Sequence, residues 1–118
     1  MVQEIERLAV SEFLKAADLG GENYRIQTVV DSLKKAGYNT VGIIREIKAS
    51  GSDITWNDRD GYTSYEMTFY LDVVNPEGLS EVLRIYFNIS YDKQEAEVAG
   101  HGKAKTIAEN VLKEHYAL

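Results

Sequence analysis

The sequence predicts an α+β fold in which an antiparallel sheet carries helices packed on one face, as a two-layer sandwich. Three observations support this prediction: a turn motif between two alternating segments, helical periodicity near both chain ends, and the absence of any internal repeat or linker. The chain is therefore interpreted as a single α+β domain over residues 1–118, long enough to bury a substantial core. The expected order of elements is α-α-β-β-β-β-α.

Two helices are expected at the start of the chain. Apolar residues at helical spacing predict the first over residues 3–18, where a pair of glycines ends it. The second is expected over residues 23–36, with Gly37 as a left-handed cap and Tyr38 as its apolar follower. Because few residues separate the two segments, an antiparallel helical hairpin is predicted.

Residues 40–49 fit two structures. Their apolar residues alternate as in a strand, but a different subset fits a helix capped by Thr40. A strand is favoured, because β-branched residues dominate and Gly42 weakens a helix. Residues 50–63 are rich in Gly, Asp and Asn and are expected to form a polar loop.

The turn that begins at Asn75 and ends at Gly78 predicts the register of two strands, at about 64–75 and 80–91. Asn at its first position, Pro at its second and Gly at its fourth favour a type I turn followed by a left-handed residue. If Asn75 pairs with Leu79, the strands present one apolar face, which helices are expected to cover. That face carries Met67, Phe69, Leu71, Leu83, Ile85, Phe87 and Ile89.

The same register predicts the composition of the outer face, which would meet water or a partner. Its opposed pairs are Asp72 with Val82, Tyr70 with Arg84, Thr68 with Tyr86, and Glu66 with Asn88.

A short strand and a last helix complete the expected fold. The strand covers residues 94–99, with Ala96 and Val98 facing inward. The helix covers residues 103–116, with His115 on its apolar side as a half-buried packing residue.

Charge and composition disfavour several classes of function. The net charge of −6 and the pI near 4.9 disfavour nucleic acid and anionic membranes, and suit a basic protein partner. No apolar run approaches the ~18 residues of a membrane span, and no basic-then-apolar leader begins the chain. A cytoplasmic protein without membrane contact is therefore expected.

No catalytic residue, metal or cofactor is expected. The chain has no cysteine and only two histidines, and no nucleophile-elbow motif. The loop around Asp58 and Asp60 fits an EF-hand at two positions, but Trp56 and Met67 would occupy its two ends. Local turn hydrogen bonds explain these acidic residues better.

The start of the last helix offers a candidate phosphate site. Glycines and lysines gather there, and backbone N–H groups at a helix start can hold a phosphate. The residues are Gly100, His101, Gly102, Lys103 and Lys105. This stretch resembles the end of a double-stranded RNA-binding domain, in which a Gly-x-Gly strand end precedes a helix that opens with lysines. The resemblance implies binding to phosphates and 2′-hydroxyls across a minor groove, although Ala108 stands where that family has a further lysine.

The outer face of the hairpin is the preferred candidate interface. An arginine between tyrosines is held by cation–π contact, and both residue types are enriched at protein interfaces. The candidate residues are Tyr70, Arg84, Tyr86, Thr68 and Glu66. The sequence thus favours a small, acidic, non-enzymatic module that binds a protein, either a basic partner or a second copy of itself as a homodimer. One version is an inhibitor or adaptor that covers a nucleic-acid-binding surface on its target. The structural alternative is an ordinary exposed sheet face.

Overall fold

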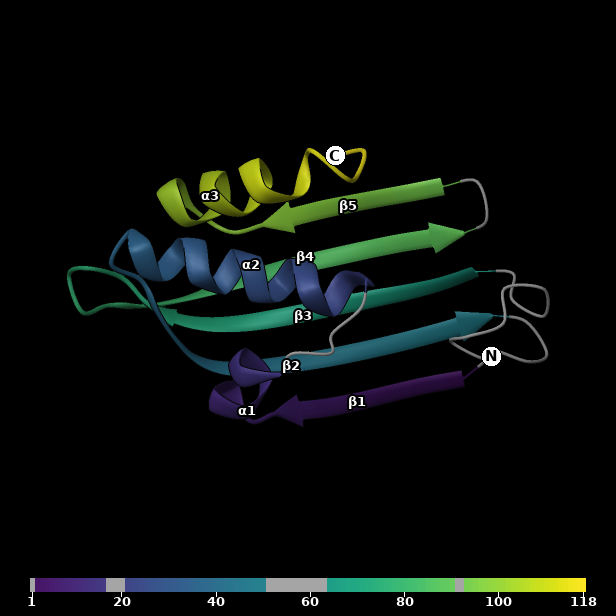
Figure 1. Cartoon of the computed structure of the whole chain (residues 1–118), viewed down its shortest axis with the longest axis horizontal. Helices are drawn as coiled ribbons and strands as arrows, with labels where there is room; N and C mark the ends of the chain where they lie inside the picture. Colours follow the sequence, from purple (N-terminus) through teal and green to yellow (C-terminus); the bar gives the residue numbers. More distant parts are fainter. Residues whose placement is uncertain (1, 17–20, 51–63, 91–92) are drawn as a thin grey trace.

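A computed structural model of the chain describes residues 2–16, 21–50, 64–90 and 93–118 (Figure 1). Its sheet has five antiparallel strands in the order β1-β2-β3-β4-β5, which is also their order along the chain. The α+β class is therefore confirmed. The elements are β1 (Val2–Leu8), α1 (Val10–Lys15), α2 (Gly21–Lys35), β2 (Asn39–Ser50), β3 (Ser64–Val74), β4 (Ser80–Ser90), β5 (Lys93–Ala99) and α3 (Gly102–Leu112).

The N-terminal segment differs from its prediction. In place of one helix over residues 3–18, the chain forms β1 and then the short α1. Strand β1 pairs with β2, which places Leu8 opposite Ile43. These ladder bonds satisfy the backbone of both strands, and they outweigh a helical pattern carried by few apolar residues. The observed order starts with a strand, so the expected α-α start and helical hairpin are wrong.

Helix α2 agrees closely with its prediction. Its predicted stripe is buried, with Ile26 and Leu33 fully inaccessible. The helix ends at Lys35, and Gly37 follows with a φ of 92°, in the left-handed region. There Tyr38 N–H donates to the Leu33 carbonyl at 2.9 Å, and Gly37 N–H donates to the Lys34 carbonyl at 3.0 Å. This pair of bonds is the Schellman motif, and Tyr38 enters the core as its apolar follower.

The hairpin is confirmed in its turn and in its register. Asn75 N–H donates to the Leu79 carbonyl at 2.8 Å, and Gly78 N–H donates to the Asn75 carbonyl at 2.9 Å. Gly78 has a φ of 86°, as the left-handed position after a type I turn requires. Every predicted pair forms, from Leu71 opposite Leu83 outward. Residues 40–49 also form a strand, as favoured, within β2.

The core lies between one face of this sheet and the helices α2 and α3. The seven apolar residues predicted for that face are all buried, and they share one cluster with α2 and α3 side chains. The ring of Phe87 meets Phe69 edge-on at 6.0 Å between centroids and Tyr116 at 5.0 Å. Figure 1 shows α2 lying over the middle of the sheet, roughly along the strand direction, and α3 beside β5.

The C-terminal segment departs from the prediction after Leu112. Strand β5 forms as expected, with Ala96 and Val98 buried, but α3 ends at Leu112. His115 therefore lies beyond the helix and is exposed, so its expected packing role is wrong. The chain turns back here, Tyr116 enters the core instead, and Ala117 pairs with β5. The Ala96 N–H donates to the Ala117 carbonyl at 2.8 Å.

Candidate protein interface on the sheet

The sheet face opposite α2 and α3 holds the predicted interface residues together. Tyr70 lies opposite Arg84, and Thr68 lies opposite Tyr86, on adjacent strands β3 and β4. Strands β2 and β5 extend these rows sideways, which the sequence did not predict. The three rows read Ile44, Tyr70, Arg84, Ala99; Glu46, Thr68, Tyr86, Glu97; and Lys48, Glu66, Asn88, Glu95.

Arg84 and Tyr86 form a cation–π pair on this face. The guanidinium carbon of Arg84 lies 5.9 Å from the centroid of the Tyr86 ring, two residues along the same strand. Tyr70 lies directly across from Arg84 on β3, as the predicted register requires. Such a contact restricts the arginine and keeps its guanidinium over the aromatic ring.

The phenol of Tyr86 is surrounded by carboxylates. Its hydroxyl donates to the carboxylate of Glu66 across the strands. Burial raises the pKa of Tyr86 to about 12, and the hydrogen bond to Glu66 and the negative charges of Glu66, Glu95 and Glu97 act in the same direction. We call Glu66, Arg84, Tyr86, Glu95 and Glu97 the Tyr86 cluster. It brings three carboxylates and one guanidinium to a single aromatic ring.

Thr68 has a different position from the other predicted residues. Only 7% of its surface is exposed, although it lies on the outer face. It sits in the row between Glu46 and Tyr86, whose longer side chains flank it. Thr68 therefore supports the surface rather than offering a contact of its own.

Two exposed apolar residues lie on the same face. Val82 of β4 is 58% exposed and lies opposite Asp72, and Ile5 of β1 is 66% exposed and lies opposite Glu46. Val82 was placed on this face by the predicted register. Ile5 was missed, because the sequence pattern assigned it to a helix.

The two lysines of the predicted phosphate site lie in different places on the surface. Lys103 lines a groove between α2 and α3, whereas Lys105 lines a separate hollow beside β5. Side chains two positions apart leave opposite sides of a helix, so these two lysines cannot converge on one phosphate. Gly100 has a packing reason instead, since a Cβ there would lie 2.7 Å from Leu83 Cδ1.

Sequence reasoning missed a buried polar cluster around Glu22. Its carboxylate accepts hydrogen bonds from the hydroxyls of Tyr116, at 2.9 Å, and Tyr65. Burial raises the pKa of Tyr116, followed by the charge of Glu22 and the hydrogen bond to it, while Arg25 acts in the opposite direction. The cluster joins α2, β3 and the C-terminal turn. No sequence pattern could reveal it, because the three residues are far apart along the chain.

The described ranges contain no candidate metal site and no helix that could span a membrane. Within them no group of three or more His, Cys, Asp and Glu side chains could hold a metal ion. Across these same segments, every helix is too short or too polar to cross a membrane. The loop with Asp58 and Asp60 lies outside the described residues.

Comparisons with known proteins return no relative. No family model matches the chain, and no match is found among curated proteins or solved structures. The function is therefore inferred from the geometry of the described residues.

Proposed function

We propose that this protein is a small, non-enzymatic binding module that docks a basic protein on the helix-free face of its sheet. In this proposal its two-layer arrangement assigns packing to one sheet face and recognition to the other. The observation that supports the proposal is the Tyr86 cluster, in which Glu66 and Arg84 hold an aromatic ring among three carboxylates. Side chains already fixed in the free protein lose less conformational entropy on binding.

The chemistry of the face favours a cationic partner. Lysine or arginine side chains of a partner would meet Glu97 on β5 and, beside it, Glu95, whose carboxylate also lies 3.1 Å from Lys93 Nζ. Tyr86 offers the large aromatic contact that is typical of interface hot spots, and Val82 adds exposed apolar surface. An excess of negative charge also speeds the encounter with a basic protein. A target whose nucleic-acid-binding surface is basic would be inhibited by being covered in this way.

Selection of displayed random peptides on the full chain tests this proposal. We expect the enriched peptides to carry two or more basic residues beside an aliphatic or aromatic one. Their binding should be lost with Tyr86→Ala and with Glu97→Lys, and retained with Asp31→Lys. Asp31 is an exposed residue of α2, so its variant carries the same change of charge away from the sheet. Equal losses with Glu97→Lys and Asp31→Lys would contradict a local site.

Light scattering separates a foreign partner from a second copy of this chain. We expect wild type and Arg84→Glu to have the same monomeric mass if the face binds another protein. A wild-type dimer that becomes a folded monomer in Arg84→Glu would instead assign the face to self-association.

A further inference from the structure

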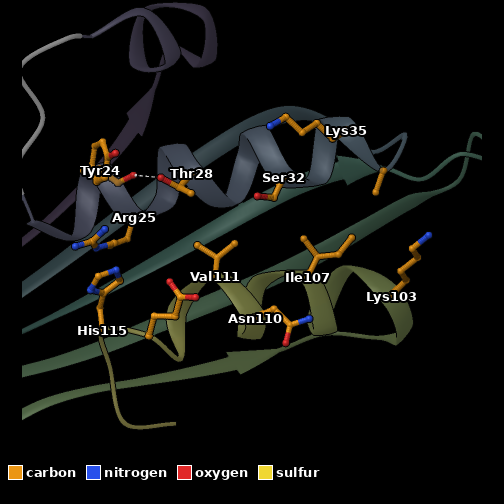
Figure 2. Close-up of a pocket in the computed structure, with 12 residues that line it drawn as sticks. Tyr24, Arg25, Thr28, Ser32, Lys35, Lys103, Ile107, Asn110, Val111 and His115 are labelled. Carbon is orange, nitrogen blue, oxygen red and sulfur yellow. Dashed lines mark hydrogen bonds between the residues drawn. The ribbon is translucent and has the colours of Figure 1, made fainter.

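A groove between two helices forms a second surface, on the side of the molecule away from the proposed interface. Helices α2 and α3 run side by side in opposite directions, and the groove between them has a volume of about 760 Å³ (Figure 2). Its apolar middle is formed by Ile107 and Val111, which point from α3 toward α2. Both side chains are partly buried and pack against the core. The middle of the groove is therefore fixed by the fold.

The charge of this groove is opposite to that of the whole molecule. The protein carries a net charge of −6, yet the groove is lined by Arg25, Lys35 and Lys103 and by a single carboxylate, Glu114. Figure 2 shows Arg25 facing His115 at one end and Lys103 at the other. The ten residues from Arg25 to Lys35 span about 15 Å of helix. Arg25 and Lys103 thus bracket an apolar centre over about that length, while the Lys35 side chain points away from α3 (Figure 2).

We propose that this groove binds an acidic peptide segment of a partner protein. An aliphatic side chain of the segment would pack on Ile107 and Val111, and a carboxylate at each end would meet the basic residues. An extended segment of about six residues has the required span, since each residue advances ~3.3 Å. This site is independent of the Tyr86 cluster, which selects the opposite charge.

The observations favour a peptide over a nucleic acid. Over Ile107 and Val111 a phosphate backbone would meet only the neutral groups of Ser32 and Asn110, because the cationic side chains stand toward the ends of the groove (Figure 2). Stacking of successive bases uses a series of aromatic side chains, whereas among the described residues that line the groove Tyr24 is the one tyrosine and no Phe or Trp is present. A long polyanion would also be repelled by the net charge of the molecule, whereas a short segment responds mainly to charges within about 10 Å.

Titration of the ¹⁵N-labelled full chain with a synthetic peptide tests the proposal. The probe is the capped peptide Glu-Ser-Leu-Leu-Ser-Glu, and its control is the same peptide with Ser in place of both Leu residues. We expect chemical-shift changes centred on Ile107 and Val111, with a Kd of roughly 0.1–1 mM that weakens as salt is added. The control peptide should bind at least about threefold more weakly. No shift changes up to several millimolar probe would overturn the proposal.

Two lysines of the same helix provide matched variants. Lys103→Glu should weaken the peptide roughly tenfold, because it places a carboxylate beside the bound one. Lys105→Glu makes the same change of charge outside the groove and should alter the Kd by less than about twofold. Equal weakening by both would show unspecific electrostatics and overturn the site. Tighter binding of a single-stranded oligonucleotide, lost in Lys103→Glu, would replace the peptide with a nucleic acid. Tyr86→Ala, which should abolish binding at the sheet face, should leave binding of this peptide unchanged, so failure of one proposal can be distinguished from failure of the other.

Discussion

The two faces of the β3–β4 hairpin use neighbouring residues for different purposes. Leu83, Ile85 and Phe87 of β4 are at most 1% exposed and pack against the helices. Arg84 and Tyr86 alternate with them, remain partly exposed and contact each other. We therefore expect the inner face to determine stability, and substitutions on the outer face to have little effect on the fold.

The largest expected effect comes from the inner face. Phe87→Ala should lower the free energy of unfolding by about 3–5 kcal/mol, because it opens a cavity beside Phe69 and Tyr116. Urea denaturation of the purified variant measures the change. The matched control is Tyr86→Ala, at the preceding residue, which lies on the outer face. It should lower the free energy of unfolding by clearly less. Similar losses in the two variants would contradict the division between the faces.

A smaller loss of stability is expected at the buried polar cluster around Glu22, on the inner side of the sheet. Tyr116→Phe removes a hydrogen bond to the buried carboxylate of Glu22 and should cost about 1–3 kcal/mol. Tyr24→Phe makes the same chemical change on a side chain that is 48% exposed. Thermal or urea unfolding should show little effect of this control. If both variants are equally stable, Tyr65 alone satisfies Glu22.

Tyr86 of the outer face should make the stability of the protein depend on pH above pH 10. The pKa of Tyr86 rises from 10.0 to about 12 on folding, so the folded state keeps a proton that the unfolded state loses. Its contribution is complete below pH 10 and disappears as the pH rises toward 12. Wild type should therefore lose more stability over this window than Tyr86→Phe, measured by urea unfolding at several pH values. Parallel pH profiles would show that neither burial nor the nearby carboxylates raise the pKa of Tyr86 on folding.

The smallest effect is expected at Val82. Val82→Thr keeps a β-branched side chain at a position that is 58% exposed, and should change stability by no more than about 0.5 kcal/mol. The comparison variant is Leu83→Ala, one residue further on the inner face, which should cost about 2–5 kcal/mol. A large loss in Val82→Thr would mean that something covers this part of the outer face.

The parts of the fold that could be predicted are those with local determinants. The turn from Asn75 to Gly78 and the alternating pattern agree on one register, so the neighbours of Arg84 followed from the sequence. The N-terminal strand could not be found in this way. Its partner β2 lies more than thirty residues further along the chain, and Leu8 and Phe13 fit a helical spacing equally well.

The candidate sites likewise contain a part that local sequence predicts and parts that depend on residues distant in the chain. The approach of Arg84 to Tyr86 is local, whereas the carboxylates of Glu95 and Glu97 reach Tyr86 only through the pairing of β5 with β4. The groove between α2 and α3 depends on how two distant helices pack. Neither arrangement leaves a pattern in the sequence.

The pairing of Ala117 with β5 limits how copies of this chain could associate through their strand edges. Sheets join edge to edge when both edges have free backbone groups. At the β5 edge, Ala117 already bonds to the backbones of Gln94 and Ala96. A head-to-tail array needs β5 of one copy against β1 of the next, and this tail obstructs it. Two β1 edges can still meet in an antiparallel pair, which closes as a two-fold dimer and cannot grow into a fibre.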